Sequence, residues 1–256
     1  MIKNEYEIDD ALGNGFYGKS YKCRHKSISH DLVLQEILLS NLAKSEKEDV
    51  LEETALITKL KHPNIVQCHK CFIDKNSFCS ICEYIDGVSL KDKIQSANGT
   101  FFDENTILNW FVQICFAVKY IHDNNILHRN LHLSNMILTD YGVIKLNGFQ
   151  YAKILDHSPE YPNANYGTPY NLCPETCLGL PYTSKSDIWA LGIILYQLCT
   201  LDNSIGFNTL ISSSLLIQNS PTSSMNEGEI DTEDEIAIPD LYSNDLKMLI
   251  RTLIDK

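Results

Sequence analysis

Residues 126–138 read Ile126-Leu127-His128-Arg129-Asn130-Leu131-His132-Leu133-Ser134-Asn135-Met136-Ile137-Leu138 and place a polar loop between two apolar segments. Apolar residues at helical spacing precede the loop over residues 105–124, and branched apolar residues follow it. This pattern predicts a helix, a loop and a strand, in that order. The residue at the centre of the loop is Asn130. Its carboxamide is not basic at physiological pH, whereas a carboxylate there could accept the proton of an attacking hydroxyl group.

The composition is that of a globular protein with a sizeable core. The chain has 256 residues, of which 44% are hydrophobic and 9% aromatic, enough for one large domain or two lobes. Its formal net charge of -12 argues against binding to nucleic acid or to an anionic membrane surface. Residues 1–6 contain no apolar signal core, and no window reaches the roughly 18 apolar residues of a membrane span. We therefore expect an intracellular, cytoplasmic protein.

The loop at 126–138 resembles the catalytic loop of protein kinases, in which His-Arg-Asp is followed, five residues after the Asp, by an Asn. The resemblance puts Asn130 at the position of the catalytic base and His132 at that of the catalytic-loop Lys. Asn135 takes the position of the Asn that binds a metal ion. The loop therefore keeps the residues that give it its shape and lacks the base.

A glycine-rich stretch near the N-terminus has the pattern Gly13-x-Gly15-x-x-Gly18. This pattern alone fits a Rossmann unit, a loop over kinase phosphates or a simple hairpin. A Rossmann motif runs into a helix, but residues 19–24 have the composition of a second strand, so we predict a hairpin with a glycine tip. That arrangement resembles the glycine-rich hairpin of protein kinases.

The residues after this hairpin resemble the kinase nucleotide site but depart from it where charge is needed. In the strand predicted at 31–37, Gln35 takes the position of the Lys that contacts the nucleotide phosphates. Ser20 replaces the valine that normally covers adenine. In the helix predicted at 45–60, Glu53 takes the position of the glutamate that pairs with that Lys. Without the Lys, a solvated helix residue is an equally good interpretation of Glu53.

Residues 83–87 resemble the hinge between kinase lobes, with Cys82 before them at the position that gates the adenine pocket. The remaining positions of this vestigial nucleotide site are Glu83, Ile85 and Ile137. The strand at 143–150 should deliver Asp-Phe-Gly, and Phe149 fixes the alignment. Gly148 then stands where the magnesium-binding Asp is expected.

Two motifs in the second half of the chain resemble one group of kinases in particular. Residues 167–175, Gly-Thr-Pro-Tyr-Asn-Leu-Cys-Pro-Glu, nearly match the end of the activation segment in the NIMA-related (NEK) serine/threonine kinases. Residues 186–192 resemble the start of the buried central helix of the large lobe. Ala164 stands where the family has its activating threonine. The resemblance covers about residues 5–256 and implies the two-lobe kinase fold.

Nine cysteines are scattered through apolar segments, and their odd number argues for reduced thiols rather than a disulfide framework. Cys68-x-x-Cys71 and Cys79-x-x-Cys82 could bind zinc if each motif lay on a tight turn. The sequence instead predicts two strands, on which positions i and i+3 face opposite sides. Buried thiols are therefore the preferred interpretation, and a zinc module is the alternative.

The last part of the chain combines a polar stretch with a helix. Residues 202–240 are rich in Ser and Asn and carry an acidic run, which predicts either a solvated loop or a docking site for a basic partner. A helix is predicted over 241–256. Its apolar face should comprise Leu246, Leu249, Ile250 and Leu253. In the family a further helix carries an Arg that pairs with the position of Glu175, and we expect that helix to be missing.

These observations predict an α+β fold of the two-lobe protein-kinase type, with a small antiparallel lobe over residues 1–84 and a larger, mainly helical lobe over 85–256. The ammonium, the metal ligand and the base are all missing from their positions. We therefore expect a pseudokinase that binds other proteins, such as an active kinase or a cytoskeletal component. No cofactor is expected, and ATP and Mg²⁺ should bind weakly at best. The alternative is a residual ATP-dependent serine/threonine kinase that uses Lys22 or Lys19 as a relocated cation.

Overall fold

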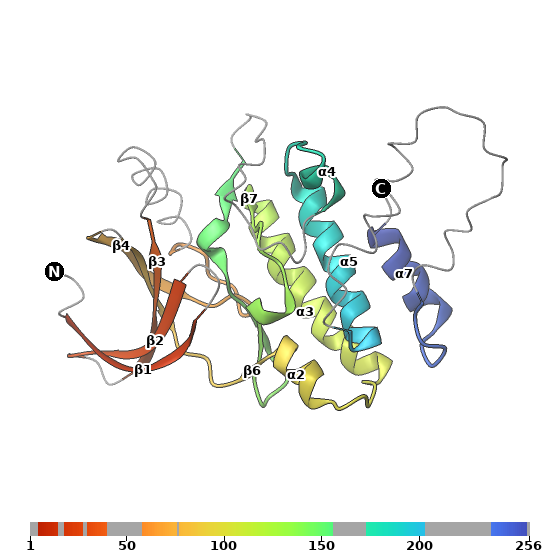
Figure 1. The fold of residues 1–256 in the computed structure, drawn as a ribbon, viewed down its shortest axis with the longest axis horizontal. Helices are drawn as coiled ribbons and strands as arrows, with labels where there is room; N and C mark the ends of the chain where they lie inside the picture. Colours follow the sequence, from red (N-terminus) through yellow and green to blue (C-terminus); the bar gives the residue numbers. More distant parts are fainter. Residues whose placement is uncertain are drawn as a thin grey trace.

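A sheet of long strands lies beside a group of helices along the longest dimension of the molecule (Figure 1). This is the arrangement of a small β lobe and a larger helical lobe that the sequence predicts. None of the helices in the described part of the chain has the length and hydropathy that crossing a bilayer requires. The computed structural model describes residues 5–14, 18–27, 30–39, 58–75, 77–155, 173–202 and 237–254.

Five antiparallel strands form the sheet in the order β1-β2-β3-β5-β4. The pairing of β1 with β2 runs from Asn14 opposite Lys19 to Tyr6 opposite His25, which confirms the predicted hairpin. A Rossmann unit is excluded, because its glycine-rich turn would lead into a helix. The bounds of the strands are β1 (Tyr6–Asn14), β2 (Gly18–His25), β3 (Asp31–Leu38), β4 (Cys68–Asp74) and β5 (Ser77–Glu83).

The register of the sheet divides its side chains between two faces. Ser20 pairs with Gln35, and Gln35 pairs with Ser80, so these three residues lie on one face. The other face carries a separate buried cluster of apolar side chains. Its members are Cys23, Leu34, Phe72, Cys79 and Ile81.

A bulge in β4 overturns one expectation from the sequence. Cys68 pairs with Cys82, and the next paired residue is Lys70, so His69 is an extra residue in the strand. The bulge brings Cys68 and Cys71 to the same face, where their Sγ atoms are 3.4 Å apart. The prediction that these two cysteines face opposite sides is wrong, because it assumes an unbroken alternation along the strand.

The helix predicted at 105–124 is α3 (Glu104–Asp123). Its N-terminus is capped by Asp103, whose carboxylate accepts a hydrogen bond from the Thr106 amide at 3.0 Å. Buried side chains recur every three or four residues and form the face toward the core, as the pattern predicts. They include Ile107, Phe111, Ile114, Val118 and Ile121.

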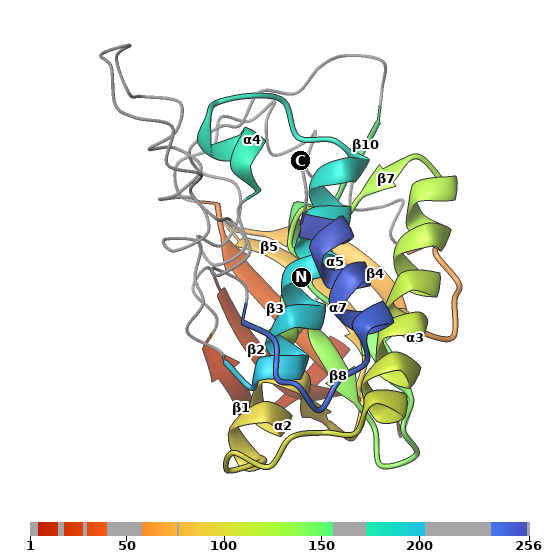
Figure 2. The same cartoon turned by 90° about the vertical axis from the view of Figure 1, so that its right-hand side faces the viewer.

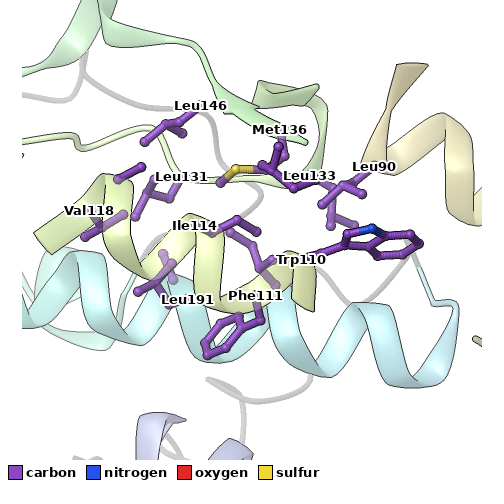
Figure 3. Packing of buried hydrophobic residues seen from close by; sticks show 14 of the residues in the cluster. Leu90, Trp110, Phe111, Ile114, Val118, Leu131, Leu133, Met136, Leu146 and Leu191 are labelled. Carbon is purple, nitrogen blue, oxygen red and sulfur yellow. The ribbon is translucent and has the colours of Figure 1, made fainter. Parts of the chain in front are cut away.

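The loop at 126–138 lies over the inner face of α3. Figure 3 shows Leu131, Leu133 and Met136 pointing into the core that α3 forms. Short strands hold both ends of the loop, because β7 pairs with β10 and β8 pairs with β6 and β9. The bounds of these elements are β6 (Val88–Ser89), β7 (Ile126–Leu127), η2 (Leu133–Asn135), β8 (Met136–Leu138), β9 (Ile144–Leu146), η3 (Phe149–Tyr151) and β10 (Lys153–Ile154).

The predicted central helix is α5 (Ser184–Thr200), which packs against both α3 and α7 (Asn244–Ile254) (Figure 2). The side chain of Thr183 and that of Ser186 form a reciprocal capping box at its N-terminus. Nearly every side chain of α5 after the first turn is buried, as expected of a helix in the interior of a lobe. Two shorter helices complete this part of the fold, α2 (Leu90–Ser96) and α4 (Pro174–Cys177).

Some predicted segments lie elsewhere than expected or outside the described residues. Most of the helix predicted at 45–60 and most of the loop predicted at 202–240 are outside them. Within α7, Leu246 and Ile250 are buried as predicted, but Leu249 is 37% exposed. The buried stripe of α7 follows a spacing of four residues, which leaves Leu249 at its edge.

Candidate functional site

A buried carboxylate fixes the backbone of the loop at 126–138. Asp187 of α5 accepts hydrogen bonds from the amides of His128 and Arg129 at 3.0 and 3.1 Å. It also accepts bonds from His122 Nε2 at 2.8 Å and from the Tyr182 hydroxyl at 2.7 Å. Burial alone would raise the pKa of Asp187, but the hydrogen bonds from His122 and Tyr182 help to hold it below its usual value. Arg129 has a φ of 64°, a strained conformation that this pairing stabilises.

His128 connects the loop to the segment that follows β9. Its Nδ1 accepts from the Asn130 amide at 3.2 Å, so its Nε2 carries the proton and donates to the Asn147 carbonyl at 3.1 Å. The ring packs edge-on against Phe149, with 4.7 Å between centroids. Burial lowers the pKa of His128 to about 4, so the ring is neutral at pH 7.

Asn130, which the resemblance puts at the position of the catalytic base, is buried, and its polar groups bond to the protein. Its side-chain Nδ2 donates to the Gly148 carbonyl at 3.1 Å, and its backbone carbonyl accepts from Asn135 Nδ2 at 2.8 Å. The first contact joins the loop to the turn after β9, and the second closes the loop on itself. A carboxamide in this position can hold the loop but cannot take a proton from a hydroxyl group.

His132, which the resemblance puts at the position of the catalytic-loop Lys, carries no positive charge at neutral pH. Asn135 Nδ2 lies 2.9 Å from His132 Nε2, which acts as the acceptor because an amide nitrogen can only donate. Burial, with smaller contributions from His128 and Lys91, lowers the pKa of His132 to about 4. The loop at 126–138 therefore has no cation at this position.

Gly148, which the resemblance puts at the position of the magnesium-binding Asp, lies against the Asn135 side chain. Its φ is 91° and its ψ is 29°, the left-handed region that favours glycine. A Cβ atom on Gly148 would lie only 2.5 Å from Cγ of Asn135. An aspartate could therefore enter this position only if the Asn135 side chain moved away. The two predicted metal-binding positions are adjacent, but they hold a carboxamide and a glycine instead of a carboxylate.

The sheet face above this loop carries uncharged side chains where the phosphate-binding Lys is expected. Gln35 is half-buried, and its Oε1 accepts from the Ser80 hydroxyl at 3.4 Å. Ser20 is its partner in register on β2. Among the glycines, Gly13 lies on β1 and pairs with Ser20 of β2, and Gly18 is the first residue of β2. Two more predicted positions, Gly15 and Glu53, lie outside the described residues.

Of the two candidates for a relocated cation, Lys22 is occupied elsewhere. Its Nζ is 2.6 Å from Asp31 Oδ2 and 4.5 Å from the centre of the Tyr84 ring. These contacts draw it toward the hinge end of the strand, away from Gln35. Lys19 is exposed and pairs in register with Glu36.

The predicted hinge is held by groups from distant parts of the sequence. Glu83 Oε1 accepts from the Gln67 amide at 2.9 Å and from Lys145 Nζ at 2.8 Å. The other two positions predicted here, Ile85 and Ile137, are half-buried and pack against the main core.

The sequence does not identify three groups of residues that position this site. Gly87 lets the hinge approach β8, because a Cβ there would lie 2.5 Å from the carbonyl oxygen of Leu138. Lys145 and Gln67 bind the hinge carboxylate, and only the fold brings them to it. The hydrogen-bond donors around Asp187 are the third group. A signal for them exists in the sequence, because a buried acid in an apolar helix requires partners.

Comparison with known proteins agrees with this geometry. Residues 6–256 match the family model described as the protein kinase domain. The chain is 40% identical to the human serine/threonine-protein kinase Nek5 over 208 residues, which is 81% of this chain and 29% of that protein. It is 40% identical to mouse Nek1 over 190 residues, 74% of this chain and 16% of that protein. With mouse Nek3 the identity is 34% over 253 residues, 99% of this chain and 46% of that protein.

A sheet of five antiparallel strands, a helical lobe and a loop anchored by a buried aspartate together define a protein-kinase domain. The chain belongs to the protein kinase family, and within it the chain is similar to the Nek serine/threonine kinases. It spans less than half the length of the three relatives compared above.

Proposed function

We propose that this Nek-like kinase domain is a pseudokinase, which binds other proteins and transfers little or no phosphate. The observation that carries the proposal is the contact around Gly148. The carboxamide of Asn135 fills the space beside Gly148 that an aspartate side chain would need, and it is held there by Asn130 and His132. The position of the metal-binding carboxylate is thus both uncharged and filled.

The energetic argument rests on how phosphoryl transfer is catalysed. Positioning and electrostatic stabilisation by metal ions and cations supply almost all of the rate enhancement. A general base contributes a factor of about 10² to 10⁴, and a single electrostatic donor about 10² to 10³. The chain lacks the base at Asn130, the carboxylate at Gly148 and the ammonium at Gln35. Even strongly non-additive losses at three positions leave negligible turnover.

The residues do not fit Mg·ATP. The phosphates of ATP would contact Gln35 and His132, which are both uncharged at neutral pH. A metal ion would have Asn135 as a ligand, with no carboxylate beside it. We propose instead that the partners are proteins, such as an active kinase or a cytoskeletal component, and that they recognise the outer surface of the domain.

The second candidate is a residual serine/threonine kinase. It is favoured by the names of the relatives, which describe serine/threonine-protein kinases. For this chain it requires a cation to move to the phosphates. Lys22 would have to leave Asp31 and Tyr84 to do so.

A thermal-shift titration with ATP, with and without Mg²⁺, tests the proposal. With a Kd of about 1 mM, about 100 μM ATP adds only about 0.06 kcal/mol to the free energy of unfolding, whereas a Kd of about 10 μM adds about 1.4 kcal/mol. We expect no detectable change in Tm. A rise of a few degrees that depends on Mg²⁺ and disappears in Asn135→Ala would contradict the proposal.

Phosphate transfer distinguishes the two candidates directly. We expect no incorporation from γ-labelled ATP into a generic protein substrate. Incorporation that is lost in Lys22→Ala or in Lys19→Ala would establish the second candidate instead.

A further inference from the structure

Three cysteine thiols lie together at one end of the β4–β5 pair. We call Cys68, Cys71 and Cys82 the thiol cluster. Cys68 and Cys82 are partners in register, and the bulge at His69 turns Cys71 toward the same face. The Sγ atoms of Cys68 and Cys71 are 3.4 Å apart. Cys79, the fourth cysteine of the two motifs, belongs to the cluster on the opposite face of the sheet.

The thiol cluster does not have the arrangement of a metal site. Within the described ranges, no three His, Cys, Asp or Glu side chains are arranged so that they could hold a metal ion. The zinc module considered from the sequence therefore has no support from the described residues. What the cluster offers is a close pair of sulfur atoms.

The geometry of the pair favours a bond between the two sulfurs. A disulfide has an S–S distance of about 2.05 Å, so the sulfurs need to approach each other by about 1.4 Å. Cys68 is buried, with 4% of its surface exposed, whereas Cys71 is only half-buried. Cys71 is therefore the more exposed residue of the pair.

The two sulfurs are also within hydrogen-bond distance of each other, and either thiol can be the donor. A thiolate is the nucleophile in oxidation and in exchange. Loss of one proton from the pair therefore leaves a nucleophilic sulfur with a second sulfur within reach.

We propose that Cys68 and Cys71 are a redox modification site that forms a reversible disulfide on exposure to hydrogen peroxide. The thiolate of Cys71, the half-buried residue, attacks one peroxide oxygen, so that an S–O bond forms, the O–O bond breaks and the hydroxide that leaves takes the proton of Cys68. The Cys68 thiolate then attacks the Cys71 sulfur. The S–S bond forms, the S–O bond breaks, and the second hydroxide takes up the proton that Cys71 had released. Two thiols are oxidised by two electrons, and one peroxide is reduced to two waters.

The site lies where a bond would change the surroundings of residues predicted to belong to the vestigial nucleotide site. Cys68 is opposite Cys82, which directly precedes the hinge residue Glu83. Cys71 is opposite Ser80, which donates to Gln35. A disulfide would close a short ring around the bulge and remove the thiol protons that now link the cluster. The proposal does not depend on whether the domain transfers phosphate.

Peptide mapping of the unmodified chain tests the proposal. The chain is treated with hydrogen peroxide, denatured, alkylated and cut with trypsin, which cleaves after Lys70 and so separates Cys68 from Cys71. We expect a disulfide-linked pair of peptides containing these two residues and a loss of two of the nine thiols. Treatment with a dithiol should restore all nine. Nine thiols remaining after peroxide, or a bond from Cys68 to Cys82 instead, would overturn the proposal.

Two variants provide matched controls. Cys115 is also half-buried, but burial raises its pKa to about 11. The Cys115→Ser variant should therefore still lose two thiols on treatment with peroxide. The Cys71→Ser variant should lose no thiols to disulfide formation. If Cys71→Ser does not fold, the linked peptides of the unmodified chain still decide the question, because they require no substitution.

Discussion

At the scale of single residues, Gly148 and Asn135 make a close contact whose effect on stability can be measured. A left-handed backbone alone can be tolerated by some residues at modest cost. At Gly148 the Asn135 side chain adds a steric contact to that cost. The two effects can be separated, because Gly99 has a similar φ of 81° and a Cβ added there would meet no heavy atom within 4 Å. We therefore expect Gly148→Ala to cost more stability than Gly99→Ala.

The expected difference between these two variants is at least about 1 kcal/mol in the free energy of unfolding, measured by urea denaturation. The same measurement in an Asn135→Ala background should remove most of this excess, because the contact with the carboxamide is gone. Equal costs for Gly148→Ala and Gly99→Ala, or an excess that persists without the Asn135 side chain, would show that Asn135 does not close off this position.

The two histidines of the loop give the domain a predictable dependence on pH. The pKa values of His128 and His132 are about 4 in the folded chain, against about 6.5 in an unfolded one. Between these values the unfolded state binds more protons than the folded state. Stability is therefore fully present above about pH 6.5 and is lost as the pH falls toward 4.

His132→Gln tests this assignment, because glutamine keeps an acceptor for Asn135 and does not titrate. Between about pH 6.5 and 4.5, the free energy of unfolding should fall less steeply in this variant, by up to about 1 kcal/mol per pH unit. An unchanged slope in His132→Gln would contradict the assignment.

At the scale of elements, the bulge in β4 decides where the thiol pair lies. His69 is exposed and has no partner in register, and its removal would leave Cys68 opposite Cys82 and Cys71 opposite Ser80. Deleting it should therefore be tolerated. In the regular strand that results, the two cysteines would be two residues apart, or about 7 Å, which is beyond the usual span of a disulfide.

We expect the chain without His69 to keep its fold and its nine thiols after peroxide treatment. Circular dichroism and thiol titration measure the two outcomes. Substitution by His69→Ala keeps the extra residue, so that variant should still lose two thiols. Oxidation of the deletion variant at the rate of the parent would show that the bulge does not create the pair.

The elements differ in how far the sequence predicts them. The helices α3 and α5 are predicted correctly because their apolar residues repeat at a regular spacing, and the β1–β2 hairpin because strand composition follows the glycines. A bulge adds one residue without changing the composition, so the alternation rule misplaces Cys71. Contacts between distant segments, such as Lys145 with Glu83, leave no local pattern and arise only in the fold.

The positions of the candidate site follow from the motifs, but their state does not. The resemblance predicts that Asn130, Asn135 and Gly148 occupy positions of the catalytic machinery, and the fold brings these three residues into contact. The Asn135 side chain fills the space beside Gly148 because of the rotamer it adopts. His132 is neutral because it is buried and because its neighbours further lower its pKa. Neither property is encoded in residue spacing.

At the scale of the whole molecule, the fold and the chemistry are separable. One continuous core contains Cys68 and Cys82 from the sheet, Leu131 from the loop, and Phe149. The departures at residues 35, 130 and 148 leave these apolar contacts intact. A domain of this kind can lose catalysis and still present a stable surface to a partner, which is the role proposed above.

The final prediction concerns that surface and the overall charge of -12. An acidic run, which lies outside the described residues, is the strongest local concentration of this charge, and we propose that it docks a basic surface of the partner protein. Binding should then weaken as salt rises from about 50 to about 300 mM, because the screening length falls from about 14 to about 6 Å. The acids of the run are Glu227, Glu229, Asp231, Glu233, Asp234 and Glu235.

Two variants with equal changes in charge separate this site from a general effect of acidity. In one, Glu233, Asp234 and Glu235 become Gln, Asn and Gln. In the other, three exposed acids elsewhere, Glu7, Asp86 and Asp140, are neutralised in the same way. Proteins captured by the immobilised chain are compared at both salt concentrations. We expect the first variant to lose most of the salt-sensitive capture and the second to retain it, because attraction between charges depends on their local arrangement within a screening length. Equal loss in both variants would assign the effect to net charge, and undiminished capture by the first would place the docking site on another surface.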